Sequence, residues 1–158
     1  MSKYVKIIIV VVVCLLVGYL SSFVTKEGVI TWYPTLKKPF FNPPNSIFAP
    51  VWSVLYVCMG IAGGLVWNEL DKDKELVKKA LFFFVAQLLL NAIWSYLFFG
   101  LHNILLALIE IILLWLIIYE TYLLFKKINK TAAFLFIPYL AWVAFATVLT
   151  ISIYILNF

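Results

Sequence analysis

Apolar residues run almost without interruption along this chain, and short polar segments divide them into five stretches. The hydrocarbon core of a bilayer needs roughly 20 apolar residues for each crossing helix. The five stretches meet that length and predict membrane-spanning helices at residues 5–24, 46–68, 79–99, 104–125 and 131–156. The polar break "GLHN" is so short that the third and fourth helices must form an antiparallel hairpin. We therefore expect an all-α integral membrane protein, with residues 1–158 forming one domain, a bundle of five transmembrane helices.

Composition supports lipid as the solvent for most of the chain. Hydrophobic residues make up 66% of the sequence and charged residues 12%, whereas soluble domains carry roughly 45–50% and about 25%. The first stretch follows Lys3 and Lys6, as in a signal peptide, but it is longer than the usual apolar region and no A-x-A site follows it. We expect this segment to be retained as a membrane span.

The lysines predict how the chain is oriented, because cytoplasmic loops carry an excess of basic residues. The net charge is +5, and every basic residue is lysine. Nine lysines fall on one side of the predicted spans: Lys3, Lys6, Lys72, Lys74, Lys78, Lys79, Lys126, Lys127 and Lys130. Three fall on the other: Lys26, Lys37 and Lys38. This asymmetry predicts a cytoplasmic N-terminus and an outer C-terminus in a bacterial plasma membrane, and the flanking positions do not favour nucleic-acid binding.

The segment "KKPFFNPPNSIFAPVW" (37–52) is unusually rigid for a connection between two apolar helices. Prolines restrict φ and favour extended backbone in the residue before them, so the predicted loop 25–45 should be a stiff strap. Irregular backbone at membrane depth is tolerated where it is buried or lines a cavity. The strap's aromatic residues then form either a lid over an apolar ligand or an interfacial belt.

Three blocks of the sequence resemble one family. They are "WYPTLKKPFFNPPNSIFAPVWSVLYVCMG" (32–60), "QLLLNAIWSYLFFG" (87–100) and "PYLAWVAFATVL" (138–149), and they resemble the TspO/translocator protein family, once called the mitochondrial benzodiazepine receptor. The resemblance implies a five-helix bundle, commonly a homodimer, with a pocket capped by the first loop, and it favours the lid. It also implies binding of protoporphyrin IX or related tetrapyrroles, and of isoquinoline carboxamide and benzodiazepine drugs. For bacterial members it implies light- and oxygen-dependent porphyrin breakdown.

Helical spacing and the resemblance together give a predicted ligand site. Its members are Trp32, Tyr33, Phe48, Trp52, Tyr56, Gln87, Asn91, Trp94, Trp142 and Ala146. The tryptophans would stack on a flat ring, the Asn91 amide would supply a polar contact, and Ala146 would leave room. The alternatives are lipid packing for each tryptophan and interhelical hydrogen bonding for Gln87 and Asn91. If porphyrin is degraded, Trp52 and Trp142 are the residues expected to direct that chemistry, since no conventional acid–base pair or nucleophile is visible.

Glu110 lies inside the fourth predicted span, where an ionisable residue is a functional hypothesis by default. It suggests a structural or dimer-interface role, or a second function in which the protein transports porphyrins or hydrophobic cations. Against transport, the five spans do not divide into inverted repeats.

No metal site or cofactor is predicted. Cholesterol binding is not expected, because no basic residue follows Tyr154 to complete the proposed motif.

Overall fold

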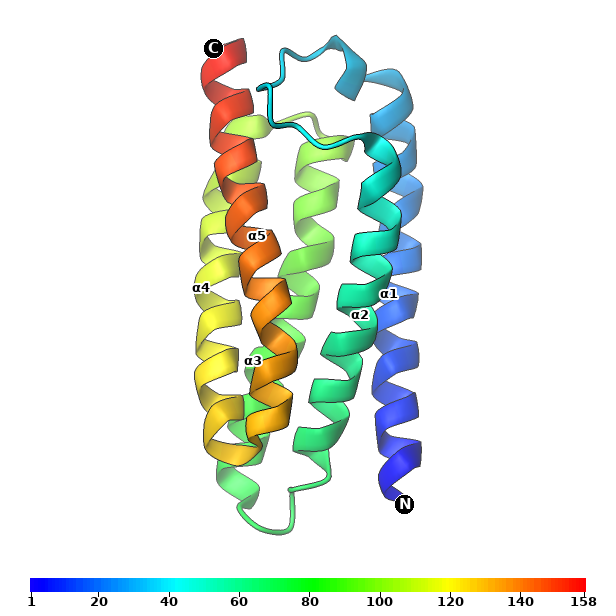
Figure 1. Cartoon of the computed structure of the whole chain (residues 1–158), viewed down its shortest axis with the longest axis vertical. Coiled ribbons are helices and arrows are strands. Elements are labelled where there is room, and N and C mark those ends of the chain that lie inside the picture. Colours follow the sequence, from blue (N-terminus) through cyan, green and yellow to red (C-terminus); the bar gives the residue numbers. More distant parts are fainter.

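The computed structural model describes all residues 1–158 and contains five long helices and no strand (Figure 1). All five are long and apolar enough to cross a membrane, which confirms the predicted all-α, five-span architecture. The helices are α1 (Lys3–Thr31), α2 (Asn45–Trp67), α3 (Lys74–Ser95), α4 (Ile104–Ile128) and α5 (Lys130–Asn157). A short 3₁₀ helix, η1 (Tyr33–Thr35), follows α1, and a π-helix, η2 (Tyr96–Gly100), continues α3.

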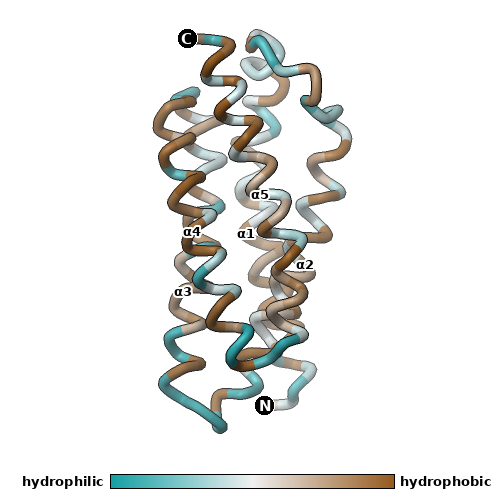
Figure 2. The backbone as a smooth tube through the Cα atoms, turned by 60° about the vertical axis from the view of Figure 1, so that its left-hand side comes forward, coloured by the Kyte–Doolittle hydropathy of each residue, from teal (hydrophilic) through white to brown (hydrophobic).

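Consecutive helices run antiparallel, so the N-terminus and the C-terminus lie at opposite ends of the bundle (Figure 1). The α2–α3 and α4–α5 connections lie at the N-terminal end, and the α1–α2 loop and the α3–α4 turn lie at the other. Helix α1 packs mainly on α2, α4 packs on both α3 and α5, and α2 also packs on α5. Hydrophilic residues gather at the two ends, with hydrophobic residues along the helices between them (Figure 2).

The first helix is longer than the sequence pattern predicted. It continues to Thr31 instead of ending at residue 24, so the irregular part of the predicted loop shrinks to about residues 32–44. The segment "TKEGVIT" contains no proline, and the helix ends shortly before Pro34, as the steric restriction on the residue preceding a proline favours. Lys26 and Glu27 therefore mark the end of the apolar stretch, but α1 continues past them to Thr31.

Side-chain caps set the starts of α3, α4 and α5. Asp73 accepts a hydrogen bond from the backbone N–H of Leu76, so α3 begins at Lys74, five residues before the predicted start. Asn103 and Asn129 accept bonds from backbone N–H groups in the same way at the starts of α4 and α5. The cap explains why α3 begins before its apolar stretch, whereas α4 and α5 begin at or within one residue of the predicted starts.

The "GIAGG" motif lets α1 and α2 pack closely within the chain. A Cβ atom placed on Gly64 would lie 2.5 Å from the Cα of Ile7, and one on Gly60 would overlap the backbone of Val11. Small residues at this spacing allow two helix backbones to approach each other. The motif is therefore used inside the bundle, at the α1–α2 contact.

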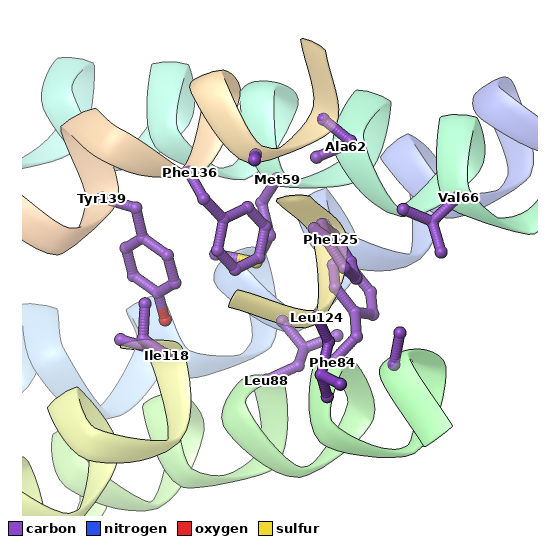
Figure 3. Packing of buried hydrophobic residues seen from close by; sticks show 14 of the residues in the cluster. Met59, Ala62, Val66, Phe84, Leu88, Ile118, Leu124, Phe125, Phe136 and Tyr139 are labelled. Carbon is purple, nitrogen blue, oxygen red and sulfur yellow. The ribbon is translucent and has the colours of Figure 1, made fainter. Parts of the chain in front are cut away.

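A buried hydrophobic cluster of aliphatic and aromatic side chains packs between the helices (Figure 3). Three phenylalanine rings contact one another, with centroids 6.0 Å apart for Phe84 and Phe125, 5.0 Å for Phe125 and Phe136, and 6.2 Å for Phe84 and Phe136. Tyr139 also packs against these rings, and its centroid lies 5.7 Å from that of Phe136. These contacts join α3, α4 and α5, and a second, smaller cluster that includes Tyr33 and Phe98 packs nearer the α1–α2 loop.

Candidate functional site

A cavity of about 480 Å³ opens in the half of the bundle next to residues 32–44. All five helices contribute to its walls, and most of the lining residues are hydrophobic. Small-molecule sites have volumes of roughly 300–1,000 Å³, with apolar walls and a few placed polar groups. The cavity thus has the size and character of a site for a small, largely apolar molecule.

Eight of the ten predicted site residues line this cavity. They are Tyr33, Phe48, Trp52, Tyr56, Asn91, Trp94, Trp142 and Ala146. They come from η1, α2, α3 and α5, so segments far apart in the sequence meet around one space. Aromatic contacts hold the walls: the Trp52 ring lies 5.6 Å from Tyr56, and the Trp142 ring lies 6.3 Å from Phe48.

Trp32 is not among the lining residues. Its ring stacks on His102 with centroids 4.3 Å apart and an interplanar angle of 4°, and it meets the edge of Phe98. Because α1 continues to Thr31, Trp32 lies over the α3–α4 turn while the next residue, Tyr33, lines the cavity. Trp32 therefore joins the loop to the turn.

Gln87 also lies outside the cavity, in a network of buried hydrogen bonds that joins three helices. The hydroxyl of Tyr139 donates to Oε1 of Gln87 at 2.7 Å and accepts from Nδ2 of Asn91 at 2.8 Å. The hydroxyl of Tyr56 donates to Oδ1 of Asn91 at 2.9 Å, and Nε2 of Gln87 contacts the sulfur of Met59 at 3.4 Å. The interhelical alternative thus holds for Gln87, while Asn91 both joins helices and lines the cavity.

The strap, residues 32–44, is tied down at several points. The Tyr33 hydroxyl donates to Oδ1 of Asn42 at 2.8 Å, and Nζ of Lys38 donates to the backbone oxygens of Tyr33 and Leu36 at 2.9 and 3.0 Å. The Asn157 side chain accepts from the backbone N–H of Lys37 at 3.1 Å and donates to its oxygen at 2.9 Å. The strap is therefore an ordered segment attached to the end of α5.

The aromatic residues of the segment divide between the two predicted roles. Tyr33 and Phe48 line the cavity, and Phe41 packs 6.2 Å from the ring of Phe145. Phe40 is 99% exposed, as expected of a residue at the membrane interface.

One wall of the cavity was not predicted from the sequence. Helix α1 contributes Ser21, Ser22, Thr25 and Lys26, which form two pairs at i and i+4 spacing; Ser22 and Lys26 are also exposed. The repeat of small polar residues at i and i+4 near the end of an apolar span was the available signal. It was hidden because the predicted helix ended at residue 24.

Glu110 is buried, with only 8% of its surface exposed, and neither carboxyl oxygen has a hydrogen-bond partner. It does not line the cavity, although its neighbour Ile111 does. The indole N–H of Trp94 is likewise buried without a partner. No three His, Cys, Asp or Glu side chains gather as metal ligands would, and the lining residues are suited to stacking and hydrogen bonding.

The sequence of this chain is similar to those of known proteins. The sequence model of the TspO/MBR family matches residues 10–156. A tryptophan-rich protein TspO of Chlorobaculum tepidum is 42% identical over 91% of this chain and 90% of its own length. Another, of Archaeoglobus fulgidus, is 41% identical over 96% of this chain and 97% of its own. The human translocator protein is 37% identical over 85% of this chain and 79% of its own.

Proposed function

The chain belongs to the TspO/MBR family, and from that premise we propose that its cavity binds protoporphyrin IX or a related tetrapyrrole. The same cavity would take isoquinoline carboxamide and benzodiazepine drugs, and the protein would act as a membrane receptor or sensor. The observation that carries this proposal is the convergence of Trp52, Trp94 and Trp142 from three helices on one apolar cavity.

The chemistry of the walls suits a flat aromatic ligand. Aromatic side chains favour offset-stacked or edge-to-face contacts, each contributing about 0.5–1.5 kcal/mol beyond burial of area. Trp52 and Trp142 stand on α2 and α5, which pack against each other, and Ala146 takes up little space beside them. Asn91 is held in place by Tyr56 and Tyr139, so a polar contact to the ligand would need no reorganisation.

We also propose that light and oxygen break down a bound porphyrin at this site. The porphyrin would absorb the light and molecular oxygen would be the oxidant. The protein would hold the ring against Trp52 and Trp142, whose oxidisable indoles influence the course of the reaction.

Titration with protoporphyrin IX tests binding and breakdown in one sample. Tryptophan fluorescence in the dark measures binding, and absorbance under light, with and without oxygen, measures breakdown. We expect Trp52→Phe and Trp142→Phe to change the rate or the products, whereas Trp67→Phe, outside the cavity, serves as the matched control. Unchanged photoproducts with unchanged binding in both cavity variants would refute the tryptophan role, and no saturable binding would refute the tetrapyrrole site.

A second function, transport of porphyrins or hydrophobic cations, is favoured by one observation. Glu110 is a buried carboxyl group without a partner in the second turn of the membrane-spanning helix α4, and ionisable residues inside spans often mark proton-coupled transport pathways. Uptake of porphyrin into proteoliposomes that is lost in Glu110→Gln would support transport. Saturable binding without uptake would support the receptor.

We propose that the lysine-rich end faces the cytoplasm of a bacterial cell, with the N-terminus inside and the C-terminus outside the plasma membrane, and that the protein forms a homodimer. The charge asymmetry supports the orientation, and the family resemblance supports the dimer. Proteolysis of terminal tags in sealed vesicles tests the first, and the mass of the detergent-solubilised protein by light scattering tests the second.

A further inference from the structure

Helix α1 gives the cavity a polar wall that the aromatic site does not use. Ser21, Ser22, Thr25 and Lys26 all line the cavity, and Lys26 is the only charged residue among its 27 lining residues. Helix α1 packs on α2 but is not a main packing partner of α5, which carries Trp142. The cavity therefore has a hydroxyl- and ammonium-bearing wall on α1 and an aromatic wall on α5.

The ammonium group of Lys26 has no partner in the chain. No acidic group lies within 4 Å, since the chain's one ion pair joins Lys72 to Glu69 at the opposite end. Lys38, at the same end as Lys26, is fully used, because it donates to two backbone oxygens and lies 4.9 Å over the Tyr33 ring. Lys26 thus supplies a free positive charge at the edge of an apolar cavity.

Two of the three neighbouring hydroxyl groups on α1 already donate hydrogen bonds within the chain. Ser22 donates to the backbone oxygen of Tyr19, and Thr25 donates to that of Ser21. The side-chain hydroxyl of Ser21 also has no partner, so it can donate to a ligand inside the cavity. The unpaired ammonium group of Lys26 fits a carboxylate, which accepts charge-assisted hydrogen bonds.

We propose that Lys26 is an anchor for a carboxylate and makes the cavity selective for flat apolar molecules that carry an acidic group at their edge. This proposal rests on the proposed function of the cavity and names its ligand class. The ring would lie toward Trp52 and Trp142, and the acid would point to α1. A neutral ring of the same shape would still bind through the aromatic wall, but more weakly.

The test compares protoporphyrin IX with its dimethyl ester, which keeps the ring and removes the negative charges. The protein, residues 1–158, is titrated in the dark in a non-ionic detergent, and quenching of tryptophan fluorescence gives both dissociation constants. Because an exposed ion pair contributes little, we expect wild type to prefer the acid by about threefold to fivefold. Lys26→Met should weaken binding of the acid alone, so that the acid and the ester have equal dissociation constants. Lys26→Arg should keep the preference for the acid.

Salt and a second lysine give further controls. Added salt should reduce the wild-type preference, because ions screen charges near the surface, and it should leave binding of the ester unchanged. Lys37→Met removes a charge at the same end of the bundle without changing the cavity lining, and it should behave as wild type.

Each contrary result has a separate meaning. If both ligands bind wild type and Lys26→Met keeps the preference for the acid, the anchor is wrong and the tetrapyrrole site stands. Equal weakening of acid and ester in Lys26→Met would show a structural role and would also overturn the anchor. Loss of the preference on addition of phosphatidylglycerol would show that Lys26 binds lipid phosphate instead. If neither ligand binds wild type, the proposed function itself fails.

Discussion

The hydroxyl of Tyr139 lies at the centre of the hydrogen-bond network, and its removal tests whether that network stabilises the bundle. Tyr139 is 1% exposed, and its hydroxyl bonds with Gln87 at 2.7 Å and with Asn91 at 2.8 Å. Tyr139→Phe removes both bonds and keeps the ring that packs against Phe136. Any loss of stability therefore reports on the hydroxyl.

The expected loss follows from the bonds that disappear. Interhelical hydrogen bonds in membrane proteins contribute about 0.6 kcal/mol on average and at most about 1.7 kcal/mol. Two such bonds amount to about 1–3 kcal/mol of unfolding free energy. Leaving a buried donor or acceptor unpaired costs about 1–3 kcal/mol, which agrees with that range.

Unfolding in mixed micelles with increasing dodecyl sulfate, followed by circular dichroism, measures this free energy. The matched control is Tyr119→Phe, because Tyr119 is 42% exposed and its hydroxyl has no hydrogen-bond partner. A double-mutant cycle with Gln87→Leu isolates the contact, and residues in one network are expected to couple by about 0.5–3 kcal/mol. An unfolding free energy of Tyr139→Phe equal to that of Tyr119→Phe, or a cycle without coupling, would show that the hydroxyl does not stabilise the bundle.

Three further predictions follow from particular contacts. Gly64→Ala places a methyl group 2.5 Å from the Cα of Ile7, so we expect α1 to pack less well, with about 1–3 kcal/mol lost in the same unfolding assay. Ala146→Leu fills part of the cavity, and we expect it to weaken binding of protoporphyrin IX in a fluorescence titration at least tenfold while the fold is kept. Asn157→Ala removes the two hydrogen bonds to the backbone of Lys37, and we expect faster amide hydrogen exchange in residues 32–44 measured by mass spectrometry.

Each of these variants has a control that changes the same residue type elsewhere. Gly100→Ala meets only side-chain atoms at 3.1 Å or more and should cost less than Gly64→Ala. Ala144→Leu changes an exposed position on α5 and should leave binding unchanged. Ser152→Ala removes a bond within α5 alone and should not speed exchange in the strap. Equal effects in a variant and its control would contradict the contact in question.

The sequence predicted which segments are helices better than it predicted which side of each helix faces the cavity. The five spans and the short hairpin turn are confirmed, because an apolar stretch of sufficient length crosses a membrane whatever its neighbours are. Trp52, Tyr56 and Asn91 could be placed together from helical spacing and the family resemblance. Helical spacing also grouped Gln87 with Asn91, but Gln87 lies one turn deeper, where the packed core leaves no space.

Local geometry decided the remaining positions. The π-helix at residues 96–100 shifts the helical phase near the end of α3, and it brings both Phe98 and Phe99 to the cavity. The extension of α1 turns Trp32 toward His102 and brings Lys26 into the lining. Neither effect could be read from the apolar pattern, because each depends on where one helix ends against another.

By itself, the sequence determined that this chain is a five-helix membrane protein, since transfer of apolar segments into lipid depends on composition and length. Only the tertiary structure decided which residues surround the cavity and that one wall of it carries a free lysine. The rotation and end of each helix follow from side-chain packing, as the close contact of Gly64 with Ile7 shows, and such contacts join residues far apart in the sequence.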